Sequence, residues 1–124
     1  MPEALVDIRK LNKKFILTSG MLYAHKRAIH AVKDVDLQIY KGETLGLVGE
    51  SGCGKSTLAK LIVRLEKASS GSICFQGENI NDYDRDALKI YRRNVQLIFQ
   101  DPYSSLNPRM SAGGIMREPL RVHK

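Results

Sequence analysis

The chain has 124 residues, of which 20 are Lys or Arg and 13 are Asp or Glu, so its formal net charge is +7. A hydrophobic content of 43% supplies a buried core and two cysteines are too few for a disulfide framework, which excludes a disordered chain, collagen and a disulfide-rich scaffold. Apolar runs such as residues 61–63 are far shorter than the ~20 residues of a membrane-spanning helix, and the first residues show no secretory signal, so we expect a cytoplasmic protein with free thiols.

Charge is distributed unevenly along the first third of the chain. No acidic residue lies between Asp7 and Asp34, and this stretch holds seven basic residues. They are Arg9, Lys10, Lys13, Lys14, Lys26, Arg27 and Lys33. The stretch is either an ordinary solvated face or a surface for a phosphate-rich partner. It lacks the regularly spaced aromatic residues of a single-strand nucleic-acid platform, so we expect no nucleic-acid partner.

Three elements are predicted in the first half of the chain. Apolar and polar residues alternate over residues 35–40, which predicts an antiparallel strand with one solvated face. Residues 44–48 form a short apolar run, which predicts a strand buried on both faces. A glycine-rich turn over residues 49–54 comes next, and the apolar spacing then changes to that of a helix. The apolar face of this helix, which starts near Lys55, consists of Leu58, Leu61, Ile62 and Leu65.

Four further elements are predicted in the second half. Residues 73–75 indicate a short strand, and a helix is expected from about Arg85 to Arg93, because acidic residues precede it and basic residues end it. Residues 95–99 indicate another strand, which is broken by the Asp-Pro that follows. A short helix is expected near Ile115–Val122, interrupted by Pro119.

One motif lies between the apolar run at 44–48 and the helix that follows it. The nine residues are Gly49, Glu50, Ser51, Gly52, Cys53, Gly54, Lys55, Ser56 and Thr57. They match the pattern G-x-x-x-x-G-K-[ST], and a strand before the motif and a helix after it are the context that a phosphate-binding loop requires. The motif therefore predicts a site for the phosphates of a nucleotide.

The residue types of the motif suit phosphate chemistry. Glycines allow the backbone to wrap closely around phosphate oxygens, and the N–H groups of residues 52–57 then point at the anion at a helix N-terminus. Lys55 supplies a positive charge for the β- and γ-phosphates, and the Ser56 hydroxyl is suited to bind Mg²⁺. Kinases, GTPases and transport ATPases share this loop, so it does not by itself identify a reaction.

Residues beyond the motif carry a resemblance to a known family. The run 92–110, which contains Phe-Gln-Asp-Pro and Ser-Leu-Asn-Pro-Arg, closely resembles the Q-loop region of ABC transporter ATP-binding subunits in the oligopeptide and dipeptide importer branch. Residues 48–58 and 118–120 resemble the same branch, and the resemblance covers most of the chain. It implies an α/β fold with the core of a P-loop NTPase and an antiparallel β portion at the N-terminus. Residues 1–124 would form the N-terminal half of a nucleotide-binding domain, with the phosphate loop at 49–57 and the Q-loop region at about 96–110.

The resemblance also implies roles for individual residues. Gln100 would be the Q-loop glutamine, which contacts Mg²⁺ or the attacking water, so it is the candidate catalytic residue and, with Ser56, a candidate metal contact. An aromatic residue upstream of the loop would stack on adenine, and Phe15 matches that place better than Tyr23. The implied ligands are ATP and Mg²⁺. The implied partners are membrane-spanning permease subunits and a second ATP-binding subunit, at the inner face of the cell membrane.

Three features of the family are missing from this sequence: a glycine-rich signature motif, a strand that ends in Asp-Glu, and a switch histidine. Asp101 and residues 111–114 look superficially like two of them but do not fit their positions. We therefore expect a truncated piece of a larger subunit that hydrolyses ATP very slowly. Its open sheet edge predicts marginal stability and self-association. Alternatives are a non-catalytic remnant that only binds nucleotide, and a small P-loop kinase. Because Cys53 lies inside the loop, alkylation of its thiol is expected to block nucleotide binding.

Overall fold

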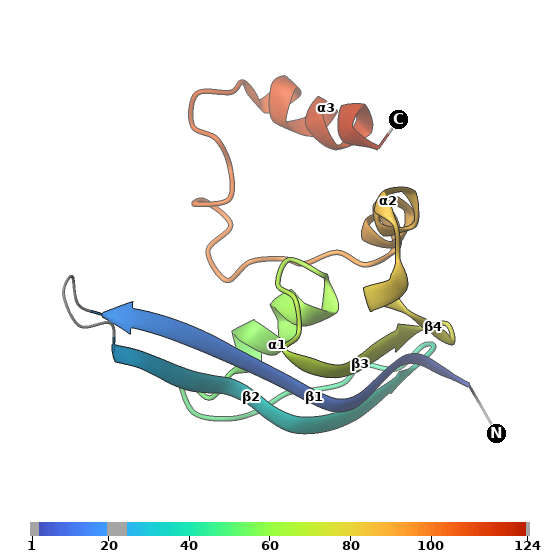
Figure 1. Cartoon of the computed structure of the whole chain (residues 1–124). Helices are drawn as coiled ribbons and strands as arrows, with labels where there is room; N and C mark the ends of the chain where they lie inside the picture. Colours follow the sequence, from blue (N-terminus) through green and yellow to red (C-terminus); the bar gives the residue numbers. More distant parts are fainter. Residues whose placement is uncertain (1–2, 20–24, 124) are drawn as a thin grey trace. The chain divides into compact units, whose positions relative to one another are not determined.

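The computed structural model describes residues 3–19 and 25–123 (Figure 1). These residues form two compact units that divide between Tyr83 and Asp84. The first unit contains strands β1 (Ala4–Ser19), β2 (His25–Tyr40), β3 (Ser70–Phe75) and β4 (Glu78–Asn79), helix α1 (Lys55–Ile62) and the short 3₁₀ helix η1 (Ile80–Asp82). The second unit contains α2 (Arg85–Asn94) and α3 (Ala112–Val122). None of the helices in the described residues has the length and apolar character needed to cross a membrane.

Strands β1 and β2 form a long antiparallel hairpin that is the main part of the first unit. The sheet order is β2-β1-β3-β4, and every pair is antiparallel. This confirms the antiparallel strand predicted over residues 35–40, which is the last part of β2. Strand β1 was not predicted, although it is as long as β2.

The middle of the hairpin has an irregular backbone conformation on each of its two strands. Lys10 and Asp34 both have left-handed backbone conformations, with φ values of 47° and 46°. The side chain of Asn12 links the two residues, since its Nδ2 donates to Lys10 O at 2.9 Å and to Asp34 Oδ1 at 3.0 Å, and its Oδ1 accepts from Asp34 N at 3.1 Å. The register shifts between Ile8 and Leu11, so that both side chains are buried although they are three residues apart.

Two carboxylates on the hairpin have perturbed acidities. The Arg9 side chain donates to Asp7 at 2.9 Å and lowers the pKa of that carboxyl. The backbone N–H of Lys10 donates to Asp36 Oδ1 at 2.7 Å and lowers the pKa of Asp36. Both carboxylates are therefore stabilised in their charged forms in the folded chain.

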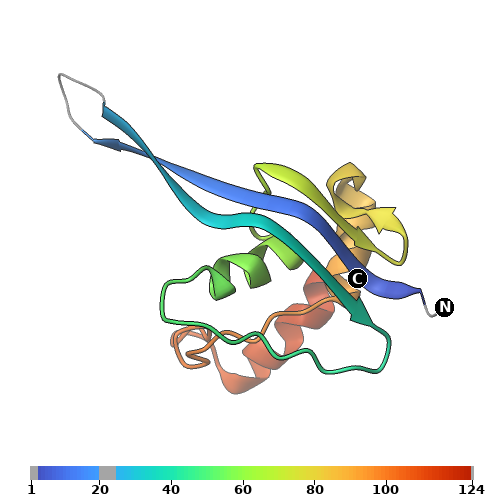
Figure 2. The ribbon, with the colours of Figure 1, turned by 90° about the horizontal axis from the view of Figure 1, so that it is seen from below.

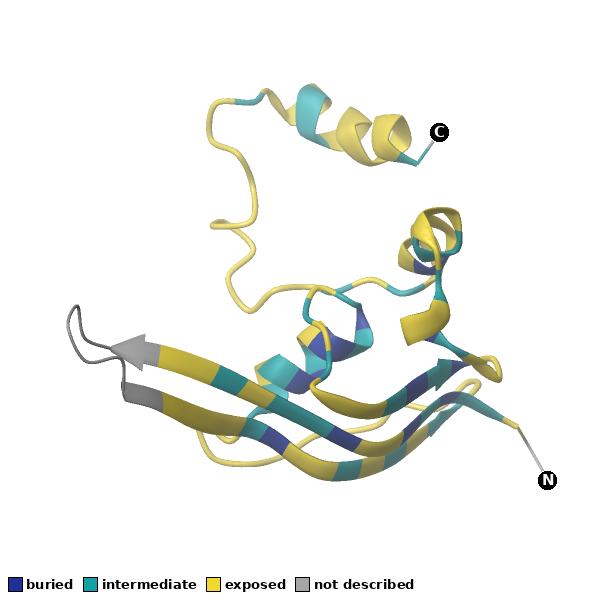
Figure 3. Ribbon diagram, viewed as in Figure 1, coloured by how far each residue is buried: buried dark blue, intermediate teal, exposed yellow. Residues whose placement is uncertain are grey.

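The core of the first unit lies between one face of the sheet and α1, which packs beside the hairpin (Figures 1 and 2). Its buried side chains come from the sheet, α1 and the segments next to them. They are Val6, Ile8, Leu11, Val32, Leu58, Leu61, Val63, Ile73, Phe75 and Ile80. The outer part of the hairpin extends past α1, and residues 14–17 and 27–31 in this part are exposed or half-buried (Figures 2 and 3).

The helices of the second unit begin at side-chain caps. Asp84 Oδ1 accepts hydrogen bonds from the N–H groups of Asp86 and Ala87 at 3.1 and 2.8 Å, and α2 then runs to Asn94. The helix predicted from about Arg85 to Arg93 is thereby confirmed. Helix α3 begins three residues earlier than predicted because Ser111 Oγ accepts from Gly114 N at 3.2 Å. Pro119 lies inside this helix without ending it.

Two of the strand predictions are wrong. Residues 44–48 and 95–99 are irregular in this structure, and within the described residues neither run pairs with a strand. A strand that is apolar on both faces needs neighbouring strands and covering layers. Most of their apolar side chains are consequently exposed, with Val48 at 95% and Ile98 at 90% of full exposure, whereas Val95 and Leu97 are half-buried. The helix face predicted to reach Leu65 is also too long, because α1 ends at Ile62 and Leu65 is exposed.

Candidate phosphate-binding site

The predicted phosphate loop passes close to β2 before it enters α1. Gly54 is the residue before the helix, with φ +99°, a conformation that side-chain-bearing residues rarely adopt. A Cβ atom at Gly54 would lie 2.1 Å from the carbonyl oxygen of Ala31. Ala31 falls in a register shift of β2, between the pairs Lys13–Val32 and Lys14–His30. The glycine is therefore required both by its backbone conformation and by this close approach.

Lys55, the first residue of α1, folds its side chain back onto the loop. Its Nζ donates to the carbonyl oxygens of Gly49 at 2.7 Å and Glu50 at 2.6 Å, and it lies 3.4 Å from Cys53 Sγ. The N–H of Cys53 also donates to the Glu50 carbonyl at 3.3 Å. The structure thus places the ammonium group inside the turn of the loop, at the head of the helix.

The N-terminus of α1 is open to an anion. No described side chain caps it, and its first turn holds no acidic residue. The first N–H groups of a helix have no acceptor within the helix, and the helix dipole favours negative charge there. Ser56, the second residue of α1, is exposed, and Thr57 is half-buried. The nine predicted loop residues therefore lie together around an electropositive helix end.

Phe15, the predicted base-stacking residue, lies on β1 opposite Ile29 of β2. It is half-buried, and Lys13 Nζ lies over its ring, 4.7 Å from the centroid. Ile29 is two residues from Ala31, against which Gly54 packs, so Phe15 and the phosphate loop meet the same part of β2. Tyr23, the alternative, lies outside the described residues. Sequence reasoning did not find Lys13, because one lysine in a basic stretch carries no distinguishing signal.

Gln100 belongs to the second unit, where it is exposed in the irregular segment between α2 and α3. Asp101, the next residue, shapes the turn that follows. Its Oδ1 accepts from the N–H of Tyr103 at 3.1 Å, and its carbonyl oxygen accepts from the hydroxyls of Ser104 and Ser105 at 3.0 Å each. The side chain of Asp101 is engaged in this turn, and residues 111–114 form the start of α3.

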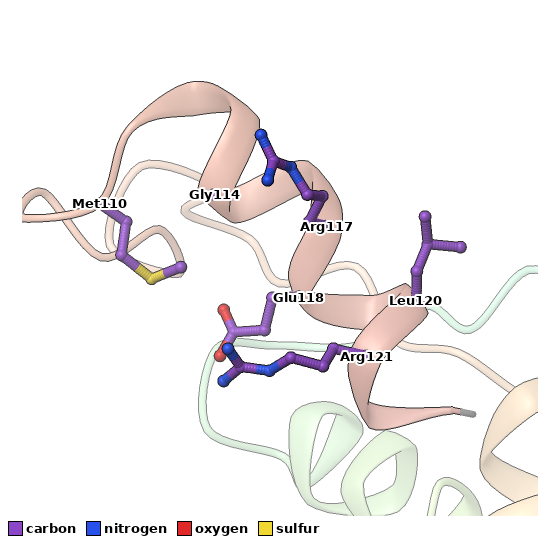
Figure 4. A pocket seen from close by; sticks show the side chains of 6 residues that line it. All are labelled: Met110, Gly114, Arg117, Glu118, Leu120 and Arg121. Atoms are coloured by element: carbon purple, nitrogen blue, oxygen red, sulfur yellow. The ribbon is translucent and has the colours of Figure 1, made fainter.

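The second unit also has a cavity of its own, of about 480 Å³, against α3. It is lined by Met110, Gly114, Arg117, Glu118, Leu120 and Arg121 (Figure 4). Glu118 and Arg121 project from the same side of the helix, toward the space that Met110 approaches (Figure 4). No residue of the predicted phosphate loop lines this cavity.

Comparison with known proteins gives a consistent family. Residues 32–118 match the ABC transporter family. The chain is 47% identical over 125 residues to the oligopeptide transport ATP-binding protein OppF of Bacillus subtilis strain 168, and the match covers all of this chain and 39% of that protein. It is 46% identical over 121 residues to the glutathione import ATP-binding protein GsiA of Escherichia coli K12, covering 98% of this chain and 19% of that protein.

Solved structures agree with these matches. A dimeric structure of MJ0796, described as a bacterial ABC transporter cassette, superposes with a TM-score of 0.77 at 29% identity, over 96% of this chain and 48% of that chain. A second structure of MJ0796, in a post-hydrolysis state bound to ADP and phosphate, gives a TM-score of 0.76 at 30% identity and the same coverage. This chain therefore spans less than half the length of these relatives. The similarities confirm the α/β fold of an ABC ATPase cassette, and the chain belongs to the ABC transporter family.

Proposed function

We propose that the loop 49–57 binds the triphosphate of ATP, and that the chain supplies this part of the nucleotide-binding domain in the energy-coupling subunit of a peptide importer. The observation that carries the proposal is the ammonium group of Lys55, held inside the loop at the uncapped start of α1. A cation and free N–H groups at one helix end form a binding site for phosphate groups. The relatives named as ATP-binding proteins of oligopeptide and glutathione import support the ligand and the transported class.

Each loop residue then has a definite task. The backbone N–H groups of residues 52–57 donate to the phosphate oxygens, and Gly52 and Gly54 keep the backbone free of side chains there. Lys55 exchanges its carbonyl acceptors for the β- and γ-phosphate oxygens. The remaining loop residues, Gly49, Glu50, Ser51 and Cys53, form the turn around the anion. Phe15 stacks on the adenine ring from β1.

The chemistry of Ser56 also fits Mg²⁺, because its exposed hydroxyl is a hard oxygen donor at the start of α1, next to Lys55. When bound, Mg²⁺ neutralises charge on the β- and γ-phosphates. Ser56 would offer its hydroxyl to the ion, and Gln100, as the resemblance of its region to the Q-loop implies, would contact Mg²⁺ or orient the attacking water. Within the assembled importer, the subunit would pair with a second ATP-binding subunit and dock on permease subunits at the inner face of the membrane.

Calorimetric titration with Mg·ATP tests the phosphate site. Lys55→Ala removes the ammonium, and Lys60→Ala is the matched control, because Lys60 is exposed in the last turn of the same helix and the variant loses the same charge. A hydrogen bond to a charged group contributes about 1.5–3 kcal/mol, so Lys55→Ala is expected to weaken binding roughly 10- to 100-fold. Lys60→Ala is expected to bind as the parent does. Equal affinities of the parent and Lys55→Ala would refute the proposal.

A further inference from the structure

Lys13 is held more firmly than its neighbours in the basic stretch. Its side chain is only 13% exposed, although it lies on the outer half of the hairpin. Its Nζ pairs with Glu66 Oε2 at 3.1 Å and donates to the carbonyl oxygen of Lys67 at 2.9 Å. The same ammonium lies 4.7 Å from the centroid of the Phe15 ring. Three separate contacts thus determine where this positive charge sits.

The Phe15 ring is only partly enclosed by the protein. Residues two apart on a strand project from the same face, so Phe15 and Lys13 share one face of β1, and Ile29 faces Phe15 across the hairpin. Ile29 is 47% exposed, and Leu17, further out on β1, is 50% exposed. The ring is therefore not enclosed by a core. The ammonium of Lys13 contacts the ring and thereby favours one orientation of it.

We propose that Lys13 is a positioning residue for the nucleotide base, because its ammonium lies over the half-buried Phe15 ring and orients this ring for stacking on adenine. This proposal rests on the proposed function of the loop. A cation over an aromatic face is attractive, and a ring that is already oriented loses less freedom when a base stacks on it. Lys13 is therefore expected to strengthen the binding of the base and not that of the phosphates.

Glu66 connects this arrangement to the phosphate loop. It follows α1, whose first residue is Lys55, and its N–H donates to the carbonyl oxygen of Lys60 at 3.2 Å. Ser69 continues the connection, since its N–H donates to Asn12 O at 2.8 Å and its hydroxyl accepts from Lys14 N at 2.9 Å. The helix that begins at the phosphate loop therefore leads directly into the segment that holds Lys13.

Two ligands separate the base from the phosphates: Mg·ATP and Mg·tripolyphosphate, both titrated calorimetrically. Lys13→Gln and Phe15→Ala are expected to weaken ATP binding about three- to tenfold while tripolyphosphate binding stays unchanged. Lys13→Arg is expected to restore ATP binding, because a guanidinium also stacks on an aromatic ring. Lys14→Gln is the control for charge, since Lys14 is exposed and the variant loses the same charge from the adjacent residue.

Glu66→Gln removes the charged partner of the Lys13 ammonium without altering the ring, and it is expected to weaken ATP binding in the same selective way, by less than Lys13→Gln does. The inference is overturned if Lys13→Gln weakens both ligands equally, or matches Lys14→Gln for both. It is also overturned if Phe15→Ala binds ATP as the parent does. Failure of the parent chain to bind tripolyphosphate would instead refute the proposed function of the loop. Far-UV circular dichroism melts of each variant show whether the fold is retained.

Discussion

The close approach of Gly54 to β2 leads to a quantitative prediction about stability. Gly52 and Gly54 both have positive φ, at +81° and +99°. A Cβ at Gly52 meets no atom within 4 Å, whereas a Cβ at Gly54 would lie 2.1 Å from Ala31 O. Replacing each glycine by alanine therefore imposes the same kind of backbone strain at both positions, but a steric clash only at Gly54.

The expected magnitudes follow from these two terms. A left-handed conformation costs a side-chain-bearing residue about 1–2 kcal/mol, which is the expected effect of Gly52→Ala on the free energy of unfolding. Insertion of an atom into a packed contact adds about 1–3 kcal/mol, so Gly54→Ala is expected to cost about 2–5 kcal/mol. That is a large share of the roughly 5–15 kcal/mol by which a domain is stable.

Urea unfolding followed by far-UV circular dichroism measures the difference between the two variants. With a denaturant dependence of about 2 kcal/mol/M, the midpoint of Gly54→Ala should lie roughly 0.5–1.5 M below that of Gly52→Ala. The measurement is made without nucleotide, so that binding does not contribute. Equal midpoints for the two variants would show that the carbonyl of Ala31 does not restrict this position.

Further predictions concern the loop thiol, a helix cap and acid. Alkylation of Cys53 should abolish Mg·ATP binding in calorimetry, and ATP should protect the thiol from alkylation. If a Cys53→Ser variant also loses binding after the same treatment, the loss is due to Cys74 instead. Asp84→Ala removes the cap of α2 and should lower the free energy of unfolding by about 1 kcal/mol in urea, with Asp82→Ala as the control outside that cap. Because the pKa values of Asp7 and Asp36 are lowered by folding from 3.8, their contribution to stability is complete above that pH and is lost as the pH falls through the folded-state values. Urea midpoints should therefore fall less steeply below pH 4 in the doubly substituted Asn variant, and identical pH profiles would contradict the assignment.

Elements with their own local signals were predictable from the sequence. The loop motif located the start of α1 at Lys55, and acidic residues before basic ones located α2. Both signals depend only on residues within a few positions of the element. The short strand β3 was identified in the same way, although it begins three residues before the predicted start.

Elements that depend on distant partners were not predictable. The register shifts of β1 place Ile8 and Leu11 on the same buried face, which breaks the two-residue period that identifies a strand. Residues 44–48 have the composition of a buried strand, but a strand also requires neighbours that the run itself does not specify. At the site, the motif indicated Lys55 and Gly54, whereas the approach of Ala31 and the contacts of Lys13 arise only from folding.

The hydrogen bonds of Lys55 have a consequence for the thermodynamics of phosphate binding at the proposed site. Its ammonium already has two carbonyl partners, at 2.7 and 2.6 Å, so a phosphate at the proposed site would replace existing hydrogen bonds and would not simply add new ones. The carbonyls of Gly49 and Glu50 would then accept hydrogen bonds from water, and the affinity for phosphate would be the balance of this exchange. Without a ligand, the Lys55 ammonium thus stabilises the turn of the loop, and a bound phosphate would take its place as the partner of this ammonium.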